Sequence, residues 1–462
     1  MNVSIFKAYD IRGVVPDELD AQNARRLGKA LVHLYRPTRV LVGCDARPTS
    51  PDLQNALVEG LIQSGVNVTV IGLCSTPMFN FAVGEANGAY DLGVMVTASH
   101  NPAKYNGFKM DLSDCLPIGQ GNGMEELRDL MVSEEPLLDA AKAGTLAQDD
   151  GVLARYVETV FRLADLPAQL PPFNVAIDAG NGMNGVTLPS VMRRVSLGEV
   201  YRLFWDPDGT FPHHEANPIK LETLKDLREA VLRNECHLGV AFDGDGDRVG
   251  FMDETGAPIP GDLLTALFAR ERLAAEPGAK ILYDVRSSWS VPEIVAESGG
   301  RAEMCRVGHA LIKRQMRETG AAFAGELSMH FYFRDLWNCE SSDLAMLLLL
   351  KIMAREKKLL SQIVASLRRY AHSGEINFTV RDSGSAMQTV ENHYAEQNPS
   401  FVSHLDGIRM EFRHPENPEG DWWFSVRASN TEPLLRLNLE AKDVEKMEAR
   451  KAELSELIES LA

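Results

Sequence analysis

The pattern of hydrophobic and polar positions predicts repeated strand–helix–strand units along much of the chain. In the first 150 residues TRVLVGCD predicts a strand, PDLQNALVEGLIQSG a helix and VNVTVIGL the next strand of a mostly parallel sheet. An apolar strand that ends in aspartate occurs three times, in RVLVGCDAR, FNVAIDAGN and AKILYDVRS. We therefore expect three copies of one α/β unit.

Each copy contains a later strand that runs into a polar loop. These segments are DLGVMVTASHNP, HLGVAFDGDGDR and AAFAGELSMH. Ligands of open α/β sheets bind outside the carboxyl ends of the strands. The three loops are therefore predicted to line one cleft.

The pattern changes after about residue 367. GEINFTV, GIRMEFRHP, WWFSVRASN and LLRLNLEA predict short strands, and DVEKMEARKAELSELIESLA predicts a terminal helix. The apolar stretch DLAMLLLLKIMAREKKLLSQIVASLRRYA before them predicts one helix that closes the third unit. The predicted domains are 1–150, 151–254, 255–366 and 367–462.

Composition and charge narrow the class of protein. The 462 residues include 47 Lys and Arg against 65 Asp and Glu, a net charge of −18 that disfavours nucleic acid or an anionic membrane as partner. The six cysteines have no CxxC spacing, which argues against a zinc site and a disulfide framework. No apolar stretch is long enough to span a bilayer, and the start lacks a signal layout. We expect a soluble cytoplasmic protein.

DGDGDR places Asp243, Asp245 and Asp247 at alternate positions, with glycines that let the chain curl. Such carboxylates suit a hard divalent cation. A calcium-binding EF-hand loop is the competing interpretation, because Glu254 stands at its twelfth position, but Arg248 replaces the glycine required at the sixth. We favour a metal site at a strand end over an EF-hand or an acidic surface turn.

Ser99 in TASHNP has two possible uses. A hydrolase nucleophile elbow would read GxSxG, which this loop does not. A serine that carries a phosphoryl group fits the predicted metal site better, with Lys109 as a candidate to activate or stabilise it. Alone, Lys109 would be taken for a surface lysine and His100 for a hydrogen-bonding loop residue.

Two further loops carry polar groups suited to a sugar phosphate. GELSMH offers a carboxylate, a hydroxyl and an imidazole able to bind vicinal sugar hydroxyls. RASNTEP offers a guanidinium, hydroxyls and backbone N–H groups suited to a phosphate dianion, although alone it would be taken for a polar hairpin turn.

Four motifs, TASHNP, DGDGDR, GELSMH and RASNTEP, stand in the order and spacing of the α-D-phosphohexomutases, and the whole chain from KAYDIRG onward resembles this family, most closely its bacterial phosphomannomutase/phosphoglucomutase group. The resemblance implies three related mixed-sheet α/β domains plus a C-terminal α+β domain around a central cleft. It also implies a mobile fourth domain that closes over the sugar.

The resemblance assigns roles residue by residue. Ser99 would be the phosphoserine, and Asp243, Asp245 and Asp247 would bind Mg²⁺ together with it. The implied substrate-binding residues are Tyr9, Arg12, His100, Arg286, Glu326, Ser328, His330, Arg427, Ser429, Asn430 and Thr431, with His309 as a further substrate contact. The candidates for proton transfer or charge stabilisation are Lys109, His309 and Arg248.

The activity implied by the resemblance is the interconversion of hexose 1-phosphates and hexose 6-phosphates of mannose, glucose or both. Phospho-Ser99 would donate its group to give glucose or mannose 1,6-bisphosphate, which then turns over in the cleft. The expected partners are hexose phosphates, with no nucleic acid or membrane, and the expected state is a monomer or weak dimer.

The sequence departs from the family pattern in the sugar loop. Leu327 and Met329 replace the residues of the commoner GEMSGH or GEMSAH, and a bulky Met329 is expected to reshape the pocket. Arg286 stands where some members have lysine, which changes donor geometry. Three alternatives stay open at this point: a phosphoglucosamine mutase, a sugar-phosphate binding protein without turnover, and a phosphatase.

Overall fold

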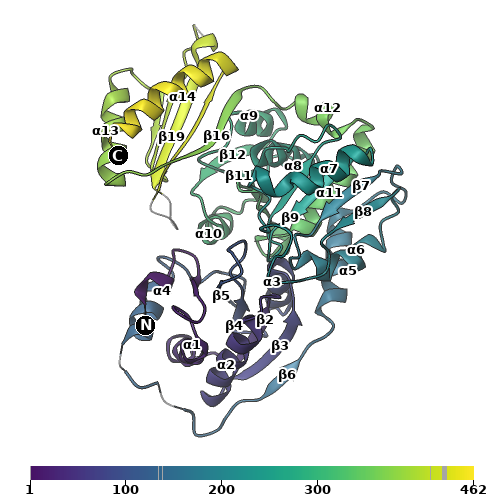
Figure 1. The fold of residues 1–462 in the computed structure, drawn as a ribbon, viewed down its shortest axis with the longest axis vertical. Coiled ribbons are helices and arrows are strands. Elements are labelled where there is room, and N and C mark those ends of the chain that lie inside the picture. The colour runs from purple at the N-terminus through teal and green to yellow at the C-terminus, as the bar shows by residue number, and fades with distance from the viewer. Residues whose placement is uncertain (1, 134, 138, 417, 429–433, 462) are drawn as a thin grey trace.

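The computed structural model describes residues 2–133, 135–137, 139–416, 418–428 and 434–461. They form four sheets, with the first at the bottom of Figure 1 and the C-terminal sheet at the top left. The first sheet has the order β1-β5-β4-β2-β3-β6. Its strands are β1 (Ile11–Val14), β2 (Arg39–Cys44), β3 (Asn67–Leu73), β4 (Leu92–Val96), β5 (Tyr105–Leu112) and β6 (Leu146–Gln148). Its helices are η1 (Val3–Ile5), α1 (Ala21–Tyr35), α2 (Ser50–Gln63), α3 (Thr76–Glu85) and α4 (Met124–Val132).

The second sheet has four strands in the order β10-β9-β7-β8. Its strands are β7 (Val175–Asp178), β8 (Val200–Leu203), β9 (Leu238–Phe242) and β10 (Val249–Met252). Its helices are α5 (Val152–Ala164), α6 (Asn184–Met192), η2 (Leu221–Leu224) and α7 (Lys225–Arg233). The register pairs Phe242 with Val249, so the DGDGDR segment, residues 243–248, is the whole connection between β9 and β10.

The third sheet has five strands in the order β12-β11-β13-β14-β15. Its strands are β11 (Lys280–Asp284), β12 (Arg301–Cys305), β13 (Phe323–Gly325), β14 (Phe331–Phe333) and β15 (Cys339–Glu340). Its helices are α8 (Gly261–Ala275), α9 (Ser290–Glu297), α10 (His309–Thr319), η3 (Arg334–Leu336), α11 (Ser342–Glu356) and α12 (Leu360–Ala365).

The fourth sheet is antiparallel in the order β16-β20-β19-β18-β17. Its strands are β16 (Ala371–Phe378), β17 (Phe401–Ser403), β18 (Ile408–Phe412), β19 (Trp422–Ala428) and β20 (Leu435–Ala441). Its helices are α13 (Ser383–Ala395), η4 (Pro418–Gly420) and α14 (Val444–Glu459). The predicted fold class, three mixed-sheet α/β units plus a C-terminal α+β unit, is confirmed, whereas the predicted boundaries after residues 150, 254 and 366 stay predictions.

One strand order recurs in the first three sheets, as β5-β4-β2-β3, β10-β9-β7-β8 and β14-β13-β11-β12. In each, the strand that ends at aspartate lies parallel to the strand that feeds the polar loop. The strand after that loop returns antiparallel, which makes the sheets mixed. The three predicted copies are therefore present, and each copy places its aspartate and its loop at the same edge of its sheet.

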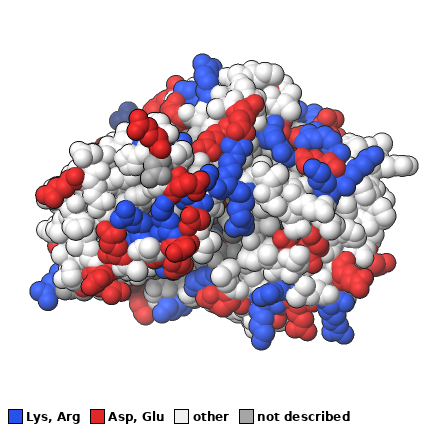
Figure 2. All heavy atoms as spheres, turned by 90° about the horizontal axis from the view of Figure 1, so that it is seen from above, with Lys and Arg blue, Asp and Glu red and all other residues white. Residues whose placement is uncertain are grey.

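The hydrophobic cores show how the units are joined. One large core runs from α3 through the second and third units, the first unit has a further core of its own, and the C-terminal unit has a separate core. Acidic and basic side chains are interspersed over the face seen in Figure 2. Within the part of the chain that the structure describes, no helix combines the length and the apolar character needed to cross a bilayer.

The long apolar stretch before the last unit is not one helix, and this prediction was wrong. Lys357 adopts a left-handed backbone conformation with a φ of 53° and ends α11 with a hydrogen bond to the Met353 carbonyl oxygen. Leu360 then begins α12. α11 packs against α5 and α6 of the second unit as well as α8, so it joins two units rather than closing one.

Close packing of α1 on α2 depends on Gly60, and it generates a stability prediction. A Cβ at Gly60 would lie 2.2 Å from the Arg25 carbonyl oxygen, a clash with backbone that only movement of a helix relieves. We expect Gly60→Ala to destabilise the first unit by about 1–3 kcal/mol, measured by urea unfolding. Gly384→Ala is the control, because its exposed Cβ would meet nothing closer than 3.4 Å; equal destabilisation by both variants would contradict the helix-packing argument.

Candidate active site

A buried arginine organises the serine loop that follows β4. The Arg47 guanidinium donates to three carbonyl oxygens of this loop, those of Ser99 (2.8 Å), Asn101 (2.6 Å) and Pro102 (2.9 Å), and to that of Tyr105 (2.9 Å), where β5 begins. Asp45, at the end of β2, pairs with Arg47 Nε at 3.1 Å. The loop therefore takes its shape from a charge pair anchored on the neighbouring strand.

Ser99 itself has a left-handed backbone with a φ of 51°. A non-glycine residue in this region is strained, and surrounding contacts must hold it there. Its N–H donates to Thr97 Oγ1 at 3.0 Å, and Thr97 Oγ1 donates to Asp45 Oδ2 at 2.7 Å. The same aspartate thus supports both Arg47 and the serine backbone.

The acidic triad lies in the tight connection between β9 and β10. One oxygen each of Asp243, Asp245 and Asp247 lies within 4.8 Å of the others, and all three residues are buried. Gly246 has a φ of 76°, and a Cβ there would lie 2.5 Å from Asn184 Oδ1. The glycine thus allows the turn that gathers the carboxylates, as the sequence predicted.

The electrostatics of the triad call for positive charge. Burial, followed by the charges of Asp247 and Asp245, raises the pKa of Asp243 well above its usual value. Asp245 Oδ1 is buried without a hydrogen-bond partner among the described residues. Carboxylate oxygens are the ligands that Mg²⁺ prefers. The three aspartates therefore fit a divalent cation.

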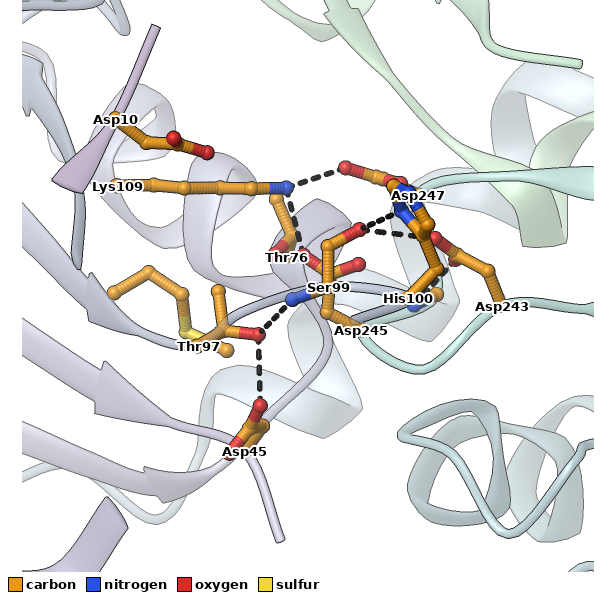
Figure 3. A network of polar contacts seen from close by, with 12 residues as sticks. Asp10, Asp45, Thr76, Thr97, Ser99, His100, Lys109, Asp243, Asp245 and Asp247 are labelled. Atoms are coloured by element: carbon orange, nitrogen blue, oxygen red, sulfur yellow. Dashed lines mark hydrogen bonds and ion pairs between the residues drawn. The ribbon is translucent and has the colours of Figure 1, made fainter. Parts of the chain in front are cut away.

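Lys109 of β5 reaches the triad from the first unit (Figure 3). Its Nζ lies 2.6 Å from Asp245 Oδ2 and 2.5 Å from Asp247 Oδ2. Burial alone would lower the pKa of this ammonium, but the two aspartates raise it above its usual value. Thr76, at the start of α3, also donates to Asp245 Oδ2 at 2.7 Å. Lys109 is therefore a fixed positive charge at the site.

The serine hydroxyl faces the triad across the boundary between two units. Ser99 Oγ lies 3.2 Å from Asp243 Oδ2 and 3.2 Å from His100 Nδ1 (Figure 3). Burial, with the charges of Arg248 and Arg12, keeps the pKa of His100 well below its usual value. The structure thus brings together three features that the sequence singled out: Ser99, the neighbouring His100 and the acidic triad.

The sugar-type loop after β13 joins the same network. His330 Nδ1 lies 2.9 Å from Glu326 Oε2, and His330 Nε2 lies 3.3 Å from Asp247 Oδ1. Burial opposes a charge on this imidazole, yet Asp247 is the main group that raises the pKa of His330 to about 9. Ser328 Oγ lies 3.2 Å from His330 Nδ1, and Arg248 forms a backbone bridge with His330. The second and third units therefore meet at this histidine.

Tyr9, Arg12 and His309 lie beside these groups. Tyr9 donates to the Val307 carbonyl oxygen at 2.8 Å, and its ring meets His309 edge-on at 5.5 Å. Arg12 donates to Asn101 Oδ1 of the serine loop at 2.5 Å. Neither ring nitrogen of His309 has a hydrogen-bond partner in the described chain, and burial, with the charges of nearby lysines, lowers its pKa well below the usual value.

The predicted phosphate residues lie partly outside the described residues. Ser429, Asn430 and Thr431 fall in that group. Arg427 is described and buried, and its NH2 nitrogen lies 3.5 Å from Glu375 Oε2. Arg286 forms an ion pair with Asp284, with 2.8 Å between NH2 and Oδ2. Its NH1 nitrogen also lies 3.3 Å from Glu375 Oε2. Two predicted phosphate contacts therefore meet at one carboxylate.

The unusual sugar-loop residues have separate positions. Met329 has a φ of 69° and is buried in the large core, and a Cβ on Gly250 of β10 would lie 3.0 Å from its sulfur. Leu327 donates its N–H to Asp284 Oδ2 at 2.8 Å. The bulk of Met329 is thus accommodated against the second unit.

Sequence reasoning noted that the strand in RVLVGCDAR ends in an aspartate but assigned no role to Asp45 or Arg47. Their signal is the Asp-x-Arg sequence DAR directly after β2, which recurs as DVR in the third unit with Asp284 and Arg286. In both, the arginine N–H donates back to the aspartate, at 3.0 and 2.7 Å. The missed pair is thus the first-unit counterpart of a pair that the sequence did expose.

The domains of one known protein family match most of the chain. The phosphoglucomutase/phosphomannomutase family matches through its alpha/beta/alpha domain I at residues 3–136, domain II at 154–256, domain III at 260–370 and C-terminal domain at 375–457. The chain belongs to this family. It is thereby a phosphohexomutase, an enzyme of the isomerase class.

Individual relatives are similar over their full length. A phosphomannomutase of Methanocaldococcus jannaschii is 39% identical over 100% of this chain and 98% of its own. The structure of a phosphoglucomutase/phosphomannomutase family protein from Burkholderia thailandensis matches with a TM-score of 0.88 and 32% identity, over 100% and 98% of the two chains. An Aspergillus fumigatus N-acetylphosphoglucosamine mutase shares the fold, with a TM-score of 0.57 and 12% identity over 99% and 95%.

The role of Arg47 gives a prediction. Lysine keeps the charge but has no planar fork to serve four carbonyl groups. We expect Arg47→Lys to lower kcat/KM by about 10²-fold, the cost of misplacing reacting groups by about 1 Å. The thermal unfolding midpoint of the variant shows whether it is still folded. Arg128→Lys is the control, because Arg128 forms an exposed ion pair with Asp129. Unchanged kinetics for Arg47→Lys would show that the loop does not need the guanidinium.

Proposed function

We propose that the protein interconverts hexose 1-phosphates and hexose 6-phosphates of mannose, glucose or both, through phospho-Ser99 and a hexose 1,6-bisphosphate. The observation that carries the proposal is the 3.2 Å separation of Ser99 Oγ from Asp243 Oδ2, beside Lys109. A serine in this place has positive charge and metal-type ligands ready to stabilise a phosphoryl group. The Aspergillus fumigatus mutase of the same fold was crystallised in complex with glucose 1,6-bisphosphate.

The proposed cation is Mg²⁺, held by Asp243, Asp245 and Asp247 together with an oxygen of phospho-Ser99. The buried, unpartnered Asp245 Oδ1 supports this assignment. When bound, the ion supplies positive charge beside the transferred group. Lys109 stays charged, so it adds a second positive charge on the same side.

In the first half-reaction, the bond between Ser99 Oγ and phosphorus breaks while a bond forms from phosphorus to the free sugar hydroxyl oxygen. The proton of that hydroxyl leaves to a base, and Ser99 Oγ keeps the electron pair of the broken bond and gains a proton, so that its hydroxyl forms again. Lys109 stays protonated and Arg248 would stabilise charge, so His309, whose neutral ring has no hydrogen-bond partner among the described residues, is the candidate that accepts the proton of the sugar hydroxyl. The bisphosphate then reorients in the cleft and returns its other phosphate to Ser99.

The remaining predicted residues hold the substrate. Glu326, Ser328 and His330 would bind sugar hydroxyls, with Tyr9, Arg12 and His100 at the border of the site. The phosphate that is not reacting would be held by Arg286, Arg427, Ser429, Asn430 and Thr431. Positioning and charge neutralisation of this kind supply most of the rate in phosphoryl transfer.

The full-length similarity to phosphomannomutases favours this proposal over a phosphoglucosamine mutase. The intact serine, triad and lysine favour it over a binding protein without turnover. A coupled assay of glucose 1-phosphate and mannose 1-phosphate, with Mg²⁺ and a trace of glucose 1,6-bisphosphate, decides between these functions. Turnover of either sugar supports the proposal, and turnover of neither contradicts it.

Removal of the serine hydroxyl tests the phosphoserine. We expect Ser99→Ala to lower kcat by at least about 10³-fold, because loss of the covalent nucleophile of a serine protease costs about 10⁶-fold. Mass spectrometry should find no phosphorylated residue in the peptide that contains position 99. Ser460→Ala, in the exposed end of α14, is the control. Substantial residual turnover of Ser99→Ala would refute the assignment.

The metal assignment has a test that does not depend on turnover. We expect Asp245→Asn to weaken Mg²⁺ binding by at least about tenfold in titration calorimetry, since even indirect ligand support is worth 10- to 100-fold. Asp52→Asn, on the exposed first turn of α2, should bind Mg²⁺ as the unaltered protein does. Equal binding by both variants would place the cation elsewhere.

A further inference from the structure

Glu375 of β16 is surrounded by three arginines where the third unit meets the C-terminal unit. Its Oε2 lies 3.3 Å from Arg286 NH1 and 3.5 Å from Arg427 NH2, and its Oε1 lies 3.1 Å from Arg436 NH1. The first arginine comes from the loop after β11 and the other two from β19 and β20. One carboxylate thus binds the two guanidinium groups proposed above as phosphate contacts.

The backbone around Glu375 is irregular in a way that helps to position this side chain. The register of β16 against β20 shifts between His372 and Glu375, which marks a bulge. Gly374 within it has a φ of 71°, and Asn438 of β20 donates to the Gly374 carbonyl oxygen at 3.0 Å. Bulges beside active sites commonly redirect a side chain. Here the bulge precedes the residue that meets the arginines.

The charges show that the arginines have capacity for a further anion. Arg286 already pairs with Asp284, and Arg427 Nε is buried without a hydrogen-bond partner among the described residues. Burial and the charge of Arg286 lower the pKa of the Arg427 guanidinium. Burial disfavours a charge on Glu375, but the three arginines lower its pKa below the usual value, so it is ionised at neutral pH. Glu375 is therefore a single negative charge at a site suited to a dianion.

We propose that the Glu375 carboxylate is an internal competitor for the phosphate monoester that Arg286 and Arg427 bind. It sets how tightly that phosphate is held and how readily it is released. The inference rests on the proposed function, because it takes these two arginines as phosphate contacts. Glu375 is then an affinity-determining residue rather than a reacting one.

Release matters because the proposed reaction uses this phosphate site twice per turnover. The bisphosphate intermediate must leave the arginines with one phosphate and return to them with the other. Without the Glu375 carboxylate, Arg286 and Arg427 would hold a dianion more tightly, which would slow this exchange. A carboxylate that replaces the departing phosphate lowers the cost of letting it go.

Glu375→Gln tests the inference, because it removes the charge and keeps the shape. We expect the Kd for glucose 6-phosphate, measured by titration calorimetry, to fall about tenfold, which corresponds to roughly 1.4 kcal/mol. Inorganic phosphate should become a stronger inhibitor by a similar factor. We also expect kcat to fall while KM falls, since the bisphosphate is released more slowly. A Kd that is unchanged or higher would overturn the inference.

Two further variants guard against a purely structural effect. Glu411→Gln is the matched control in the same sheet, because Glu411 pairs with Arg409 outside the arginine cluster, at 2.8 Å; it should leave the Kd unchanged. Glu375→Asp keeps the charge but withdraws it by one methylene group, so its Kd should lie between those of the unaltered protein and Glu375→Gln. The same Kd for Glu375→Asp and Glu375→Gln would show that charge is not the cause.

Arg427→Ala separates the inference from the function on which it rests. If Arg427→Ala weakens glucose 6-phosphate binding and the unaltered protein is an active mutase, while Glu375→Gln leaves the Kd unchanged, the inference alone fails. If Arg427→Ala binds glucose 6-phosphate normally, the proposed phosphate site itself fails, and the inference fails with it.

Discussion

A buried charge needs an opposite charge beside it, and the site depends on this constraint. Lys109 and the aspartates Asp245 and Asp247 are almost entirely removed from solvent, yet the lysine belongs to the first unit and the aspartates to the second. Each set supplies the opposite charge that burial of the other requires. The two units are therefore held in the one arrangement that also places Ser99 against the triad.

The repeated unit explains why such different chemistry gathers in one place. Each copy ends a central strand at an aspartate and runs the next parallel strand into a functional loop. Asp45 supports Arg47 and the serine loop, Asp284 holds Arg286, and Asp178 lies 2.9 Å from His214 Nε2. The scaffold is the same three times, and the loop sequences supply what differs: Ser99, the acidic triad and the residues of GELSMH.

The C-terminal unit is attached by a different kind of interaction. It has its own core, and it meets the third unit through polar contacts such as Arg409 with the Val285 carbonyl oxygen at 2.6 Å and Asp406 with the Val307 N–H at 2.8 Å. Polar contacts between units can be exchanged for contacts with water or with an anion more readily than apolar packing can. The arginine cluster around Glu375 lies in this boundary, which suits the proposed binding and release of a phosphate there.

The sequence by itself determined the fold class, the three copies and the candidate loops, because strand periodicity, turn glycines and motif residues are local properties. It also brought Ser99, Lys109 and the acidic triad under suspicion from their chemistry. It did not determine that the helix before the last unit breaks at Lys357, because a lysine carries no signal for a left-handed cap. Only the tertiary structure decided what Arg47 and Glu375 do. The carbonyl groups that Arg47 binds lie 52 to 58 positions away in the chain, and the arginines around Glu375 lie 52 to 89 positions away. These groups meet only when strands and whole units pack together.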